Sequence, residues 1–90
     1  MNKSDLIPII TQEECAEVIQ AISKVFRFGP YQCHPITGVD NITHLSEEVG
    51  QLKYMLDCLI EYYGLCEATG ANAYYSKQAA LDKYEQYFPF

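Results

Sequence analysis

Apolar side chains recur every three or four positions between Leu45 and Tyr63, and this spacing constrains the fold more than any other feature of the chain. Because it matches the period of an α-helix, it predicts a helix that begins at Asp40 or Asn41 and ends at Gly64. The stripe consists of Leu45, Val49, Leu52, Leu56, Leu59 and Tyr63. A helix with one apolar face needs a partner surface, so the pattern favours a helical bundle.

Two further helices are predicted, one before this helix in the sequence and one after it, so that the helix ending at Gly64 is the second of three. Thr11 followed by Glu14 is a capping-box pattern, and it predicts a helix from Thr11 to about Phe28 that stops at Gly29. After a break around Gly70, a third helix is expected to run nearly to the C-terminus, with a spacing of Ala73, Lys77, Ala80, Leu81, Tyr84 and Phe88. Strand patterns are absent, so the predicted fold class is all-α.

The length of 90 residues predicts a single domain over residues 1–90. Three helices with wide apolar faces in so short a chain leave apolar surface uncovered. We therefore expect a bundle that is completed by self-association, as a homodimer or a higher oligomer that associates through the second and third helices.

The net charge of −6 and the presence of only six lysines and arginines argue against a protein that grips a nucleic-acid duplex by charge. No apolar run approaches the length of a membrane span. The N-terminal stretch has too short an apolar segment for a secretory signal. These features predict a cytoplasmic protein that binds neither membrane nor nucleic-acid duplex.

Acidic residues interrupt the predicted apolar faces. Glu14 falls in line with apolar residues of the first helix, and Glu48 lies within the stripe of the second. A carboxylate in an apolar stripe is costly unless a cation or a hydrogen-bond donor compensates it. If the two helices face each other, Glu14, Glu17 and Glu48 gather into one cluster of oxygen ligands, which suits Mg²⁺ or Mn²⁺.

The four cysteines form no CxxC pair and are expected to be reduced. Cys33 and His34 are adjacent, with His44 a little downstream. Adjacent side chains with a single further candidate make a poor tetrahedral zinc site, so zinc is not expected.

The order of these acids resembles the MazG-like all-α NTP pyrophosphohydrolases, which carry EExxE on one helix and ExxD on the next. The chain reads EECAE from Glu13 to Glu17 and SEEVGQ from Ser46 to Gln51. The stretches EECAEVIQAISKVFRFG, NITHLSEEVGQLKYMLDCLIEYYG and KQAALDKYEQYF look like the small members that are common in bacteriophage genomes. The resemblance covers about residues 11 to 88.

The resemblance implies a Mg²⁺ site built from Glu14, Glu17 and Glu48, the predicted catalytic residues, together with the residue at position 51. The chain departs from the family there, because Gln51 replaces the family's Asp with a neutral amide. In such enzymes the metal neutralises phosphate oxygens and orients a water for attack at the α-phosphorus, giving a nucleoside monophosphate and pyrophosphate. A phage-encoded member would act in the host cytoplasm.

Four residues are candidates for binding the nucleotide: Lys24, Arg27, Tyr31 and Lys53. Lys24, Arg27 and Lys53 can pair with phosphate, while Tyr31 can stack on a base. A basic residue near the end of a helix also stabilises the helix dipole, and tyrosines also form oligomer contacts. Both interpretations stay open from the sequence.

Two functions from different classes follow. The first is a Mg²⁺-dependent nucleoside triphosphate pyrophosphohydrolase. The second is a nucleotide-binding protein that has lost turnover and sequesters a nucleotide signal, as Gln51 suggests. A structural helical oligomer without a ligand is a third possibility, and position 51 discriminates best between the first two.

Overall fold

The computed structural model describes residues 2–87, and these form one short 3₁₀-helix and three long α-helices. The 3₁₀-helix η1 spans Lys3–Leu6, and the α-helices are α1 (Ile7–Phe28), α2 (Asn41–Tyr63) and α3 (Glu67–Tyr87). Within the described residues the only strand-like pairing is an isolated bridge between Cys33 and Asp40. The all-α prediction is therefore confirmed.

The start of α1 differs from the sequence prediction. The helix begins at Ile7 instead of Thr11, and Pro8 occupies its first turn, where a missing N–H costs nothing. Thr11 lies inside the helix, and its hydroxyl donates to the carbonyl oxygen of Ile7 at 2.6 Å. The capping-box prediction for Thr11 and Glu14 is wrong, because η1 leads directly into the helix and Thr11 bonds back to the preceding turn.

The predicted ends of α2 are confirmed. The Asp40 carboxylate accepts a hydrogen bond from the backbone N–H of Thr43 at 2.7 Å, which caps the N-terminus of the helix. At the other end Gly64 adopts the left-handed conformation with φ of 62°. The Leu65 N–H then donates to the carbonyl of Ile60, at 2.9 Å. The break before α3 therefore lies at residues 64–66 and not around Gly70, which is inside α3.

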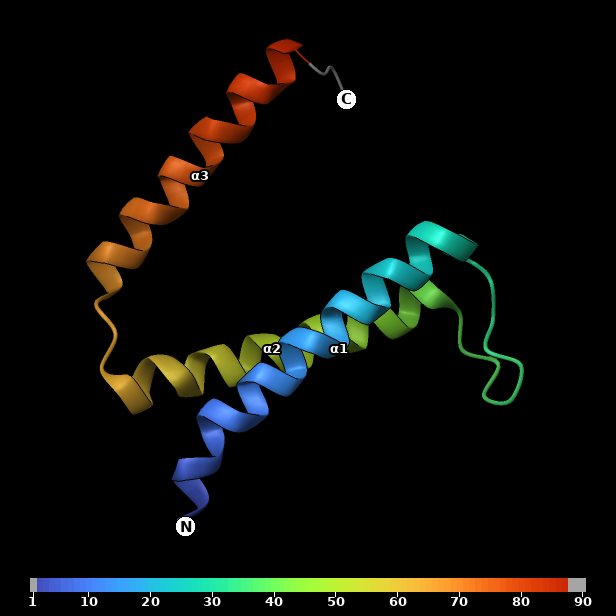
Figure 1. Ribbon diagram of the computed structural model, residues 1–90, viewed down its shortest axis with the longest axis horizontal. Coiled ribbons are helices and arrows are strands. Elements are labelled where there is room, and N and C mark those ends of the chain that lie inside the picture. The colour runs from blue at the N-terminus through green and yellow to red at the C-terminus, as the bar shows by residue number, and fades with distance from the viewer. Residues whose placement is uncertain (1, 88–90) are drawn as a thin grey trace.

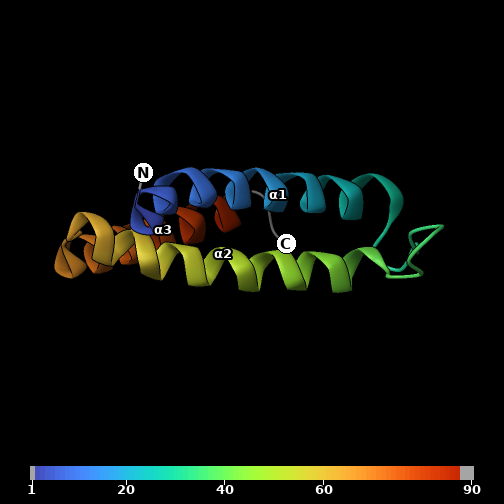
Figure 2. The same cartoon turned by 90° about the horizontal axis from the view of Figure 1, so that it is seen from below.

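Helices α1 and α2 pack side by side in antiparallel orientation, and Figure 2 shows them along their length. The Thr11 hydroxyl lies 3.4 Å from the carbonyl oxygen of Met55 at one end of the pair. At the other end the Asn41 side chain donates to the carbonyl oxygen of Gly29 at 2.9 Å. These two contacts set the register of the seam between the helices.

The seam contains the few well-buried side chains of the described chain. Among residues 2–85, Ala21 is the only apolar residue that is buried, at 1% exposure, and Thr11 and Glu48 are the buried polar residues. Ala21 lies two turns after Glu14 on the same face of α1, and this face packs toward α2. Leu56 and Tyr63, at the far end of the α2 stripe, stay exposed, so the packing against α1 covers this end of the stripe only in part.

Helix α3 turns away from the α1–α2 pair, as Figure 1 shows. Every residue from 61 to 85 is exposed. The radius of gyration is 16.5 Å, whereas a compact domain of this length has about 12 Å. A single copy is therefore an open arrangement, with one helix pair and one projecting helix.

Candidate functional site

Glu48 is the most deeply buried charged side chain among the described residues. Its exposure is 9%, because it lies on the face of α2 that packs against α1. One carboxylate oxygen, Oε1, lies 3.7 Å from Nε2 of His44, one turn earlier on the same helix. The other oxygen, Oε2, is shielded from solvent and has no hydrogen-bond partner. A buried carboxylate oxygen without a hydrogen-bond donor destabilises the fold. A cation or a hydrogen-bond donor from outside the chain would compensate it.

Glu14 repeats this feature from the opposite helix. Its side chain is half-buried, and Oε2 is again shielded and without a hydrogen-bond partner. Both acids lie on α1 and α2 between the two contacts that set the register, Thr11 with Met55 and Gly29 with Asn41. The seam thus holds two unsatisfied carboxylate oxygens, one from each helix.

The other predicted metal ligands are placed differently. Glu17 and Gln51 are exposed, although each lies about one turn from its partner acid, Glu14 or Glu48. Among residues 2–87, no three histidine, cysteine, aspartate or glutamate side chains come together as a metal-binding group. The single chain therefore brings Glu14 and Glu48 to the seam without assembling the complete predicted cluster.

The donor set nevertheless fits a hard cation. The two shielded atoms are carboxylate oxygens, and oxygen ligands are those that Mg²⁺ and Mn²⁺ prefer. Mg²⁺ commonly takes only one or two carboxylates from the protein and fills its remaining positions with water and substrate phosphates. The residues present are thus compatible with this ion.

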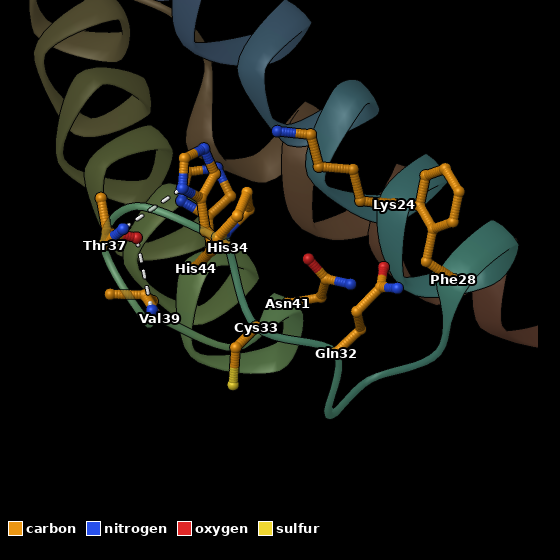
Figure 3. Close-up of a pocket in the computed structure, with 10 residues that line it drawn as sticks. Lys24, Phe28, Gln32, Cys33, His34, Thr37, Val39, Asn41 and His44 are labelled. Atoms are coloured by element: carbon orange, nitrogen blue, oxygen red, sulfur yellow. Dashed lines mark hydrogen bonds between the residues drawn. The ribbon is translucent and has the colours of Figure 1, made fainter.

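A pocket of about 430 Å³ opens beside the seam, where the end of α1 and the start of α2 meet the connecting loop. Figure 3 shows it from the side of the loop. Its lining includes Lys24, Phe28, Gln32, His34, Asn41 and His44. Of the four predicted nucleotide-binding residues, only Lys24 lines this pocket.

The remaining three candidates lie elsewhere. The Arg27 guanidinium lies 5.0 Å from the centre of the Phe28 ring, a cation–π contact at the end of α1. Tyr31 is 78% exposed, and Lys53 is exposed on α2. No structural feature of a single copy brings these three side chains together.

Sequence reasoning missed the contribution of the loop to the pocket. The sequence indicates Cys33 and His34, with His44 downstream, only as a poor zinc site, and no pattern in it marks Gln32 or Asn41 as site residues. Polar residues at both ends of a loop that joins antiparallel helices were the available signal, because the ends of such a loop meet in space.

Comparisons with protein-family models, characterised proteins and solved structures give no match to this chain. None of the described helices combines the length and the apolar character that crossing a bilayer requires.

Proposed function

We propose that the chain is a Mg²⁺-dependent nucleoside triphosphate pyrophosphohydrolase, which converts its substrate to a nucleoside monophosphate and pyrophosphate. The observation that carries this proposal is the pair of shielded, unpartnered oxygens of Glu14 and Glu48 on facing helices. Acids placed where they weaken the packing are expected at a functional site. The MazG-like order of the acidic residues along the chain supports the same conclusion.

In this proposal Glu14 and Glu48 hold the metal, and Glu17 and Gln51, each about one turn from one of these acids, are the candidate further oxygen ligands. When bound, Mg²⁺ neutralises phosphate oxygens and orients the attacking water. Lys24 lies on α1 beyond these acids and supplies positive charge for the phosphates.

A second candidate is binding without turnover, and a specific observation favours it. Position 51 carries a neutral amide, and its side chain is exposed. In the described part of a single copy the predicted ligands also do not form a group of three. A protein of this kind would hold a nucleotide signal and keep it from its receptor.

A pyrophosphate-release assay with the four ribonucleoside and four deoxyribonucleoside triphosphates, in Mg²⁺ or Mn²⁺, tests the proposal. We expect release by the parent and its loss in Glu48→Gln. Glu61→Gln removes the same charge from an exposed position of α2 and should keep the activity. Calorimetry with the same nucleotides completes the test: binding without release selects the second candidate, and neither binding nor release rejects both.

We also propose that the partner of the chain is a second copy of itself. The accessible surface is 7409 Å², about 2,000 Å² more than the roughly 5,400 Å² expected for a compact monomer of this mass. If each copy buries this excess, the interface totals about 4,000 Å², a size typical of obligate homodimers. Helix α3 is the main source of the uncovered surface, since every residue from 67 to 85 is exposed.

A further inference from the structure

The pocket beside the seam is built by a loop whose backbone is held by its own hydrogen bonds. The His34 N–H donates to Val39, the Gly38 N–H donates to His34, and the Asn41 N–H donates to Gln32, at 2.9 to 3.1 Å. These bonds hold the loop in the conformation that forms the pocket.

The backbone at the start of α2 offers little to a ligand. The N–H of Ile42 donates to Pro30, that of Thr43 to the Asp40 carboxylate, and that of His44 to the Asp40 carbonyl. Because these groups are occupied, the start of α2 can contribute to recognition in the pocket only through its side chains.

His34 lines this pocket, and the hydrogen bonds of the loop determine which of its ring nitrogens can donate. Its Nδ1 accepts hydrogen bonds from the N–H groups of Ile36 at 3.1 Å and Thr37 at 3.3 Å. A neutral imidazole whose Nδ1 accepts must carry its proton on Nε2. The Nε2–H of His34 is thus a hydrogen-bond donor that the loop leaves for another partner.

Lys24 supplies positive charge on the opposite wall of the pocket. In Figure 3 its ammonium group extends toward the side of the pocket where His34 and His44 lie. Within residues 2–87, no carboxylate forms an ion pair with Lys24, although the chain carries a net charge of −6. An unpaired ammonium that faces two imidazoles in an acidic protein is suited to an anion.

We propose that this pocket is an anion site for the phosphate chain of the nucleotide, and that inorganic pyrophosphate alone occupies it. Lys24 and His34 donate to the phosphate oxygens. His44 lines the pocket and also lies next to the seam, since its Nε2 is 3.7 Å from Glu48 Oε1. The identity of the ligand as part of a nucleotide rests on the proposed function, whereas binding of the anion requires no metal.

Calorimetric titration with inorganic pyrophosphate in the presence of EDTA tests the site. We expect the parent to bind, Lys24→Met to bind at least tenfold more weakly, and Lys24→Arg to retain most of the affinity. Lys3→Met is the matched control, because it removes the same charge at the distant N-terminus and should bind like the parent. Lys24 is exposed on α1, so these substitutions leave the packing intact.

The outcome separates this proposal from the proposed function. Absence of pyrophosphate binding by the parent in EDTA, or equal affinity of Lys24→Met and the parent, overturns the anion site and leaves the metal site of Glu14 and Glu48 unaffected. Glu48→Gln should bind pyrophosphate at least as tightly as the parent, because it removes a negative charge beside His44. A loss of metal-free binding in Glu48→Gln would likewise overturn a separate anion site.

Discussion

His44 and Glu48 lie one turn apart on α2, with Nε2 of the imidazole 3.7 Å from Oε1 of the carboxylate. This distance is too long for a hydrogen bond, so the imidazole does not satisfy this carboxylate oxygen. The second oxygen of Glu48 has no partner at all. The centre of the helix pair therefore holds a carboxylate that weakens packing, which is understandable only if the acid has another role.

Replacing Glu48 with Gln should stabilise the metal-free protein by roughly 1 kcal/mol, since it removes a buried charge that lacks a full partner. Thermal unfolding with and without Mg²⁺ measures this. Mg²⁺ at a hundredfold excess over its Kd should stabilise the parent by about 2.7 kcal/mol through mass action, and should stabilise Glu48→Gln much less. Equal stabilisation of both proteins by Mg²⁺ would remove Glu48 from the metal site.

Ala21 should tolerate no larger side chain, because it is 1% exposed where α1 contacts α2. Ala21→Leu is expected to lower the free energy of unfolding by about 1–3 kcal/mol through overpacking. Urea unfolding followed by circular dichroism measures the change. Ala16→Leu, at an exposed position of the same helix, serves as the control and should have little effect; a similar loss in both variants would argue against the described seam.

Leu81, which is 52% exposed on α3, should be covered in the assembled protein. Leu81→Glu would place a charge in that interface and shift the protein toward smaller species in sedimentation at micromolar concentration. Ser76→Glu introduces the same charge on a different side of α3 and should keep the parent's mass. A parent that sediments as a compact monomer contradicts the self-association.

The helices were largely predictable because their signals are local. The end of α1 at Phe28, the cap at Asp40 and the stop at Gly64 depend on residues within a turn of each boundary. The predicted start of α1 at Thr11 was wrong because a threonine in this sequence pattern can also lie inside a helix, where its hydroxyl bonds back to Ile7. The predicted break around Gly70 was wrong because a single glycine weakens a helix without ending it.

The candidate site was predictable only where helical spacing determines it. Glu14 and Glu48 were predicted to face each other from their place in the apolar stripes, and both carry shielded oxygens in the structure. The pocket could not be predicted in the same way, because it depends on how the loop folds around His34. Whether Glu17 and Gln51 complete the metal site depends on contacts that a single copy does not contain.

Cys66 should be the thiol that reacts at unusually low pH. Hydrogen bonds from the side chain and the backbone of Thr69 hold the pKa of Cys66 below its ordinary value. The thiolate is consequently present at pH values where an ordinary cysteine is still protonated. Iodoacetamide labelling across a pH series, with Cys15, Cys33 and Cys58 replaced by Ser, should give a midpoint below that of free cysteine, and Thr69→Ala should raise it.

Position 51 decides between an enzyme and a binding protein. Gln51→Asp restores the fourth carboxylate of the family pattern, so it should tighten the metal and raise pyrophosphate release above the parent's rate if the chain is a weakened enzyme. Because Gln51 is exposed, the new charge carries little desolvation cost, and the effect on folding should be small. Steady-state release in Mg²⁺ and Mn²⁺ measures the change.

If the chain is a binding protein, Gln51→Asp is expected to weaken nucleotide binding instead of raising pyrophosphate release. There the parent holds the nucleotide without consuming it, and an added carboxylate weakens binding in EDTA because it places negative charge beside the phosphates. Gln12→Asp introduces the same charge at an exposed position near the start of α1 and separates this local effect from a change in net charge. Release that rises in Gln51→Asp and not in Gln12→Asp identifies an enzyme, whereas nucleotide binding without release in the parent and in both variants identifies sequestration.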